Sequence, residues 1–471
     1  MKKLFLASLL LIPFGVFAQG PISEEIMQQL RASFAGNATD RAVRNALNNA
    51  ALDDLAAVRE DPVYDTHFTY EVPTSAITNQ KKSGRCWMFT GLNVLRAKAI
   101  ADHNLAKTFT LSQNYLYFFD MLEKSNLYLQ GVIDYAHLPF NDRQVQWIFR
   151  NLSDGGQFTG LADLIDKYGV VPSEIMPETE TSNNTAAMRG LIHRKLREDG
   201  LELRRTYNAA VEGLSGKKAE AAGKKARTAM EARKVEMLKD VYRILSLCLG
   251  TPPEEFTWKQ YNAKGKFIDE ETYTPKSFYS TFVGEDLKTG YVLIMNNPSL
   301  EFNKVYEVDR SRHVSEGVNW IYVNLPADRI KEIAIASLKD RRPLYFSCDY
   351  RKFNKKGLSD MDNFDYESLL GVKFGMDKAD RIISRASASS HAMNLIAVDV
   401  KDGKPVKWMV ENSFGNRSGY KGKIILSDKW FDEFMFRIVA KKQYVPADIM
   451  KLLDQKPIKC PAWDPMFLED E

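Results

Sequence analysis

The chain has 471 residues, of which 44% are hydrophobic and 27% charged, with 18 Pro, 27 Gly and four Cys. This composition excludes a disordered chain, a collagen-like repeat and a disulfide-stapled miniprotein, and it leaves enough chain for a large buried core. The formal charge of +4 falls to +2 without Lys2 and Lys3, so charge gives no argument for a nucleic-acid or membrane partner.

The N-terminus predicts an export signal. Lys2 and Lys3 precede an apolar run over residues 4–17, and Ala18 completes a small-residue cleavage pattern. A membrane anchor is the alternative, but the run is too short to span and contains Pro13 and Gly15. We expect residues 1–18 to be removed before Gln19, which would leave a periplasmic or secreted protein.

The cysteines and histidines do not form a metal-binding pattern. There is no C-x-x-C, no H-E-x-x-H and no phosphate-binding glycine loop, so we expect no metal and no cofactor. Cys248 and Cys348 lie in apolar runs and are interpreted as buried small hydrophobic residues, and Cys460 receives no role.

Cys86 stands where a polar, turn-forming segment gives way to a helix. Beyond it, Leu92, Leu95 and Ala99 recur at helical spacing. In the first turn of a helix, free N–H groups and the positive end of the dipole stabilise a thiolate, and Arg85 adds positive charge. The alternative is a structural cysteine that happens to begin a helix.

A predicted hairpin brings a histidine to an asparagine. Two strand-like runs begin at His391 and Pro405, and Asp402-Gly403 between them is a strong turn signal. With Lys401 paired to Lys404, Asn412 is a diagonal neighbour of His391 on one face and can fix its tautomer. A core histidine with a capping asparagine is the alternative. The other histidines are interpreted as ordinary surface or loop residues: His67, His103, His137, His193 and His313.

These segments resemble the papain-like cysteine peptidases, in particular the bleomycin hydrolase/aminopeptidase C branch. The resemblance rests on the cysteine segment TNQKKSGRCWMFTGLNVLR (78–96), SHAM (390–393) and VENS (410–413). It extends from about residue 22 onward through LSQNYL (111–116), DGGQ (154–157), KYGVVP (167–172), LGTPP (249–253) and PAWDPM (461–466).

The resemblance implies a role for each motif residue. Cys86 would be the nucleophile, His391 the general acid/base and Asn412 the orienting residue. Gln80 would donate to the oxyanion together with the Cys86 N–H, and Gly155-Gly156 would let a substrate backbone lie against the cleft wall. Taken alone, Gln80 is better interpreted as an ordinary loop residue and Gly-Gly as an ordinary turn.

Two departures from the family pattern bear on activity. Phe414 replaces the usual Trp after Asn-Ser, which keeps an aromatic lid over the His–Asn bond. The C-terminal arm of this branch enters the cleft and engages the substrate's amino group, but here it ends in Glu-Asp-Glu, with Glu471 last. Acidic side chains and a terminal carboxylate attract an ammonium. Because the shape of the ending differs from that of the family, endopeptidase activity remains an alternative.

The resemblance implies an α+β papain-like fold with a helical insertion. We expect an N-terminal arm and a helical half with the nucleophile in 19–185, the insertion in 186–260, a β-rich half with His391 and Asn412 in 261–456, and a C-terminal arm in 457–471. Family members assemble as hexamers, and some bind nucleic acid. The mixed charges of the insertion instead favour a solvated helix pair, so we expect peptide substrates and no nucleic-acid partner.

The predicted activity is that of a cysteine aminopeptidase acting through an acyl-thioester. A cysteine endopeptidase or a narrower, bleomycin-type amide hydrolase is the alternative, and a nucleic-acid-binding hexameric scaffold is a remote one.

Overall fold

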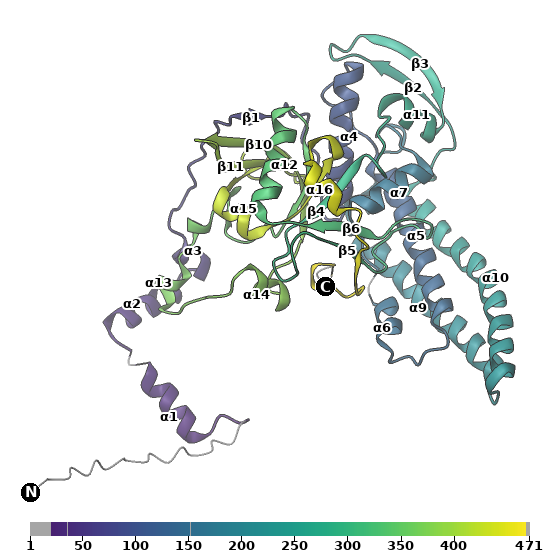
Figure 1. Cartoon of the computed structure of the whole chain (residues 1–471), viewed down its shortest axis with the longest axis horizontal. Coiled ribbons are helices and arrows are strands. Elements are labelled where there is room, and N and C mark those ends of the chain that lie inside the picture. The colour runs from purple at the N-terminus through teal and green to yellow at the C-terminus, as the bar shows by residue number, and fades with distance from the viewer. Residues whose placement is uncertain (1–19, 35, 151, 468–471) are drawn as a thin grey trace, which may run out of the picture. The chain divides into compact units, whose positions relative to one another are not determined.

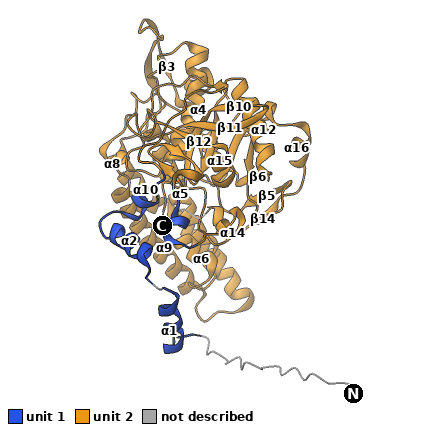
Figure 2. Cartoon of the chain, turned by 90° about the vertical axis from the view of Figure 1, so that its left-hand side faces the viewer, with its two compact units in different colours: residues 1–58, 365–372 blue, residues 59–364, 373–471 orange. Residues whose placement is uncertain are grey.

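The computed structural model describes residues 20–34, 36–150 and 152–467, which fall into two units (Figure 2). The smaller unit comprises residues 1–58 and 365–372, and the larger one residues 59–364 and 373–471. The predicted export signal (1–18) and Glu471 lie outside the described residues. The segment boundaries expected at 185/186, 260/261 and 456/457 all fall within the larger unit.

The smaller unit is built from short helices with little buried surface. They are α1 (Glu24–Ser33), α2 (Ala38–Leu47), α3 (Leu52–Ala56) and α13 (Tyr366–Leu370). Asn37 begins α2 with a reciprocal capping box to Asp40. The backbone N–H of Asp365 donates to the Ala56 carbonyl, and the Tyr366 hydroxyl donates to Asp53 (2.9 Å), so two distant segments are joined here.

The helical half of the larger unit surrounds helix α4 (Cys86–His103), which starts at the predicted cysteine. Trp87, Leu92, Leu95 and Ala99 of α4 are fully buried, because neighbouring helices cover it on several sides. The helices α5 (Gln113–Asp134) and α7 (Phe158–Tyr168) pack against it, and α6 (Arg143–Phe149) and α8 (Glu180–Asn183) belong to the same half. The predicted helix and its apolar stripe are confirmed.

Two long helices follow in the range predicted for the insertion. Helices α9 (Ala186–Val211) and α10 (Gly216–Leu249) pack against each other and against α5 (Figure 1). Their buried residues recur at helical spacing, while the charged faces remain outside. The hairpin β2 (Phe256–Tyr261)/β3 (Phe267–Tyr273) and helix α11 (Pro275–Phe282) complete this half.

The β-rich half is a sheet of 12 strands with the order β14-β5-β6-β4-β13-β7-β10-β11-β12-β9-β8, and β1 pairs with β10. Helices α12 (Ala327–Lys339), α15 (Asp428–Phe434) and α16 (Ala447–Leu452) cover part of it, and their apolar residues join a hydrophobic core separate from that of the helical half. The strand bounds are β1 (Tyr70–Glu71), β4 (Tyr291–Met295), β5 (Lys304–Val308), β6 (Trp320–Asn324), β7 (Leu344–Cys348), β8 (Asn354–Lys355), β9 (Leu358–Ser359), β10 (His391–Lys401), β11 (Lys404–Glu411), β12 (Lys423–Ser427), β13 (Met435–Lys441) and β14 (Ile458–Cys460). This half also contains helix α14 (Lys378–Ile383) and the 3-10 turns η1 (Met361–Asn363), η2 (Lys442–Tyr444) and η3 (Pro465–Phe467).

The predicted hairpin is present with its expected turn. Lys401 pairs with Lys404, and Asp402 and Gly403 both have positive φ (50° and 76°), as a two-residue type I′ turn requires. Two irregularities shift the pairing by one residue and then restore it, so Asn394 again faces Glu411 in the predicted register.

The fold class is therefore α+β, as predicted. Helix α4 packs against strands β10 and β7, so the helical half meets the sheet at the strand that begins with His391. No helix among residues 20–34, 36–150 and 152–467 is long and apolar enough to cross a membrane.

Candidate active site

Cys86 and His391 line one cleft between the helical half and the sheet. The cleft has a volume of about 940 Å³. Gln80, Gly155 and Gly156 line it as well, so residues predicted from three separate parts of the chain meet there. Asn412 lies buried behind His391.

The local environment of Cys86 differs from the sequence expectation. Burial raises the pKa of the Cys86 thiol to about 11, although the backbone N–H groups of Ala392, Trp87 and Cys86 act in the opposite direction. Arg85 does not face the sulfur, because its guanidinium binds Glu178 (2.7 Å) and the Ser182 carbonyl. The N–H groups at the helix start therefore lower the pKa of the thiol as expected, but burial outweighs them, and the charge of Arg85 is directed to Glu178 and not to the sulfur.

His391 is held by Asn412 as the hairpin predicted. Asn412 Oδ1 lies 2.8 Å from His391 Nε2 and also accepts the Ser413 N–H (2.8 Å). Because a carboxamide oxygen only accepts, Nε2 must carry the proton, which leaves Nδ1 as the free base of the neutral ring. Burial lowers the pKa of His391 to about 4.

Two aromatic rings enclose the imidazole. Phe414 stacks on His391 with ring centres 4.8 Å apart, and Tyr350 contacts it at 4.7 Å. The aromatic lid expected from Phe414 is confirmed. These rings exclude water from the His391–Asn412 bond, which strengthens it.

Gln80 is buried at the cleft and fixed at both ends of its carboxamide. Its Oε1 accepts from Ser413 Oγ (2.6 Å), and its Nε2 donates to the Ser83 carbonyl (2.7 Å). A carboxamide nitrogen has two hydrogens, so the second remains for a substrate oxygen. Ser413 therefore links Gln80 to Asn412. The sequence motif contained Ser413 but did not indicate this role.

Gly155 and Gly156 form part of the opposite wall, and the close packing behind Gly156 explains why it lacks a side chain. A Cβ on Gly156 would stand 2.3 Å from His313 Cε1 and 2.5 Å from Trp87 Cε2. Lys124 Nζ donates to the Gly155 carbonyl (2.5 Å), which fixes the loop from below.

The sequence interpretation of His313 was wrong. His313 is buried, and its Nδ1 lies 2.7 Å from Asp120, which also pairs with Lys124 (2.8 Å). His193 is buried too, whereas Cys248 is only partly buried and Cys348 fully so. The four-residue spacing of Asp120 and Lys124 on α5 could have indicated their ion pair, but the sequence contains no signal that joins Asp120 to His313, 193 residues away.

The described part of the C-terminal arm enters the same cleft. Met466 and Phe467 line it, and the Arg437 guanidinium donates to the Met466 carbonyl and lies over the Phe467 ring (4.3 Å). Upstream, β14 pairs in parallel with β5 and fixes the approach of the arm. The acidic residues 469–471 lie beyond the described range.

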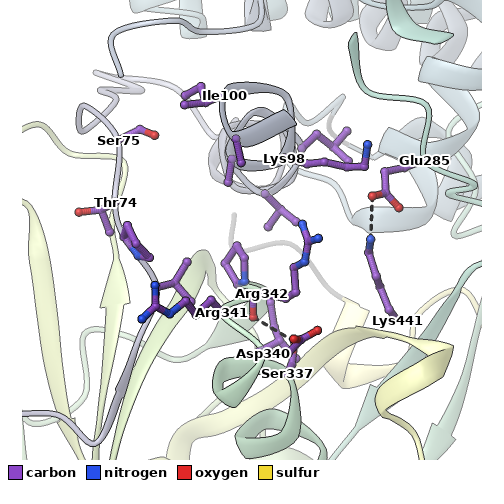
Figure 3. Close-up of a pocket in the computed structure, with 18 of the residues that line it drawn as sticks. Thr74, Ser75, Lys98, Ile100, Glu285, Ser337, Asp340, Arg341, Arg342 and Lys441 are labelled. Carbon is purple, nitrogen blue, oxygen red and sulfur yellow. Dashed lines mark hydrogen bonds and ion pairs between the residues drawn. The ribbon is translucent and has the colours of Figure 1, made fainter. Parts of the chain in front are cut away.

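A second cavity of about 390 Å³ lies along the far half of α4 and contains none of the predicted site residues (Figure 3). Lys98, Arg342, Glu285 and Lys441 line it, and Lys441 pairs with Glu285 (2.7 Å). Its lining holds no cysteine or histidine, so it lacks the nucleophile and base that the cleft provides. Among the described residues, no cluster of three or more His, Cys, Asp or Glu is placed to hold a metal ion.

A partly buried cysteine at a helix start, a histidine fixed by an asparagine and a carboxamide beside the cysteine can together attack an amide carbonyl and stabilise its oxyanion. The fold and the cleft define a cysteine peptidase.

Comparisons with known proteins give the family. The Peptidase C1-like family matches residues 21–467. Aminopeptidase C of Lactobacillus delbrueckii subsp. lactis is 37% identical over 439 residues, covering 92% of this chain and 93% of the relative. Bleomycin hydrolase of Mus musculus is 36% identical over 414 residues, covering 85% and 88%. The crystal structure of PepW from Lactobacillus rhamnosis matches with a TM-score of 0.87 and 34% identity, covering 95% of this chain and 99% of that one.

The chain belongs to the Peptidase C1-like family. The resemblance to the bleomycin hydrolase/aminopeptidase C branch is confirmed by these relatives.

Proposed function

We propose that the protein is a cysteine aminopeptidase that removes N-terminal residues from peptides through an acyl-thioester. The observation that carries this proposal is the C-terminal arm, whose Met466 and Phe467 occupy one part of the cleft that holds Cys86 and His391. An arm in that place would block the cleft on the N-terminal side of the scissile bond, so that only one substrate residue fits before that bond. Relatives named aminopeptidase C and aminopeptidase G support the same activity.

The reaction follows from the arrangement of Cys86 and His391. Nδ1 of His391 takes the Cys86 proton, and the sulfur attacks the carbonyl carbon of the first peptide bond. The carbonyl oxygen becomes an oxyanion that Gln80 Nε2 and the Cys86 backbone N–H stabilise. His391 then gives its proton to the leaving amine as the C–N bond breaks, leaving the first residue as a thioester on Cys86.

Water completes the cycle. His391, neutral again, takes a proton from a water molecule whose oxygen attacks the thioester carbonyl, and the returning proton restores the Cys86 thiol. Asn412 keeps the imidazole in the tautomer that both steps need, since its Oδ1 accepts only from a protonated Nε2. Free amino acid and the shortened peptide are the products.

Substrate N-termini provide the test. Peptides with a free N-terminus should be cleaved after their first residue, and acetylated copies of the same peptides should resist, because the arm leaves no room for the added group. Cys86→Ala should abolish cleavage while leaving the circular-dichroism spectrum and the melting temperature near wild-type values. A preference for acetylated peptides would refute the aminopeptidase assignment.

A narrower amide hydrolase or an endopeptidase is the second candidate. Relatives named bleomycin hydrolase favour the former, and the unusual Glu-Asp-Glu ending favours the latter. We propose that Glu471 and the acidic side chains before it attract the substrate ammonium. Removing residues 468–471 should then weaken the preference for free N-termini and increase internal cleavage, while an unchanged preference would exclude a role for this tail.

Two further properties are proposed from sequence and resemblance. Residues 1–18 would direct export to the periplasm or outside the cell. N-terminal sequencing of the mature protein tests this proposal, since cleavage at the expected site leaves Gln19 as the first residue. The protein would assemble as a hexamer, which light scattering tests directly. The mixed charges of α9 and α10 argue against a nucleic-acid partner, so we expect the protein not to bind DNA at moderate salt.

A further inference from the structure

Three cations on the sheet side of the cleft have no ion-pair partner among the described residues. They are Arg351, Lys352 and Arg385, and all three are exposed. The other charged side chains of the cleft are engaged: Asp154 with Arg189 (3.6 Å), Asp349 with Ser387 (2.8 Å) and Arg437 with the arm. Exposed cations without an ion-pair partner therefore remain on this wall of the cleft.

The contacts of Tyr350, which precedes Arg351, place the segment after β7 on the side of His391 that faces away from the arm. The strands run β13, β7, β10, β11 across the sheet. Arg437, which holds the arm, belongs to β13, whereas Phe414 follows β11 beyond His391. Tyr350 packs against both His391 (4.7 Å) and Phe414 (5.7 Å), so the segment after β7 crosses to the Phe414 side and carries Arg351 with it.

The orientation of a bound peptide follows from the position of the arm, and this step rests on the proposed aminopeptidase activity. The arm side receives the first residue of the substrate, whose carbonyl faces Cys86. The residues released as the leaving peptide must then run away from the arm, over Phe414 and Tyr350 toward Arg351. The amino group and the first side chain cannot reach Arg351 in this orientation.

We propose that Arg351, assisted by Lys352, binds a carboxylate on the leaving peptide, so that the preferred substrates carry negative charge one or two residues after the scissile bond. An acidic side chain or the C-terminal carboxylate of a very short peptide supplies the same chemistry. Arginine suits this task because its guanidinium donates two parallel hydrogen bonds to a carboxylate.

The expected effect is modest because the cations are exposed. Pairs of exposed opposite charges contribute little in water, so a carboxylate in the right place should raise kcat/KM about fivefold. The gain should shrink as salt is added, since the Debye length falls to about 8 Å at physiological ionic strength.

Matched peptides test the proposal. Ala-Asp-Ala-amide and Ala-Ala-Asp-amide are compared with their Asn counterparts, and Ala-Ala with Ala-Ala-amide separates the terminal carboxylate from a side chain. Release of the first alanine is followed by mass spectrometry at low and at physiological salt. We expect the acidic member to be preferred in at least one pair, with the preference lost in Arg351→Gln and reduced in Lys352→Gln.

Arg205→Gln, an exposed change on α9 outside the cleft, is the control and should keep the preference. Equal rates for acidic and neutral members in the wild type would overturn the proposal. So would an Arg351→Gln variant that slows every peptide equally, because that result means Arg351 acts on His391 and not on the substrate. If the neutral amides are cleaved but no charge preference is found, only the carboxylate-binding proposal fails and the aminopeptidase activity stands. If no peptide with a free N-terminus is cleaved, both the proposed activity and the carboxylate-binding proposal fail.

Discussion

The bond between His391 and Asn412 determines which imidazole nitrogen does the chemistry. Asn412 Oδ1 accepts from Nε2, so Nδ1 is the base. Replacing Asn412 with Ala removes the acceptor and lets the ring take either tautomer. We expect kcat/KM to fall about 100-fold, with an unchanged melting profile showing that the fold is kept. An Asn412→Ala variant with wild-type kinetics would show that Phe414 and Tyr350 alone hold the ring.

The pair formed by the partly buried Cys86 and the buried His391 predicts a broad pH range of activity. The active enzyme holds one proton between the two groups, and this state lies between the pKa values of about 4 for His391 and about 11 for Cys86. Below the lower value the pair gains a second proton, and above the upper value it has none. We expect kcat/KM to be nearly flat from about pH 6 to 9. An acid limb with its midpoint near pH 6.5, the value of an exposed histidine, would contradict the burial of His391.

The burial of His391 should also make the free energy of unfolding depend on pH. His391 is neutral in the folded chain down to about pH 4, whereas an unfolded histidine is protonated below about pH 6.5. The unfolded chain therefore binds the additional proton in that window, and this contribution to the free energy of unfolding is lost as the pH falls. Urea denaturation at pH 7 and pH 5 measures the loss, and a His391→Phe variant should show less of it.

Gln80 offers a direct test of oxyanion stabilisation. Its carboxamide oxygen is held by Ser413 and its nitrogen by Ser83, so the free hydrogen has a fixed direction. Gln80→Ala should lower kcat by roughly 10²–10³-fold with little change in KM, because the contact strengthens only in the transition state. Ser413→Ala, which loosens Gln80 but leaves it in place, should cost less. A change confined to KM would mean that Gln80 binds the ground state.

At the scale of elements, local sequence patterns correctly predicted the structures that depend only on residues close together in the chain. The helix beginning at Cys86 and the hairpin around Asp402-Gly403 were both predicted from spacing and turn chemistry, and both are confirmed. The resemblance supplied Gln80 and the glycine pair. The chain alone could not show that Arg85 turns toward Glu178, since that contact joins segments 93 residues apart.

The wall behind the glycine pair was missed for the same reason. Asp120 and Lys124 lie on α5, and His313 comes from the segment between β5 and β6. Only the folded chain brings them under Gly155 and Gly156. Periodicity reports which face of an element is buried, but it does not report the partner that buries it.

The tight packing behind this wall predicts the effect of one methyl group. In Gly156→Ala the new Cβ overlaps His313 and Trp87, so the loop must move into the cleft. We expect kcat/KM to fall at least about tenfold, because small displacements of a substrate-positioning group reduce rates strongly. Gly190→Ala on α9 is the matched control, since nothing lies within 4 Å of its Cβ. A Gly156→Ala enzyme with normal kinetics would show that this wall does not touch the substrate.

At the scale of the larger unit, a buried cation holds the described end of the arm. Arg437 contacts both Met466 and Phe467, and burial lowers its pKa to about 10. Arg437→Met keeps much of the apolar bulk but removes the hydrogen bond to the arm. We expect increased cleavage of acetylated peptides relative to free ones, measured beside the melting temperature to confirm folding. An unchanged ratio would show that β14 holds the arm without Arg437.

The nucleophile and its base come from opposite halves of the larger unit, with more than 300 residues of sequence between Cys86 and His391. Contacts so distant in sequence form late, because loop closure must precede them. A partly folded chain therefore has a cysteine without its base and cannot hydrolyse anything. The enzyme acquires catalytic competence only when both halves have folded and docked, so neither the incomplete chain nor its neighbours are exposed to a premature peptidase.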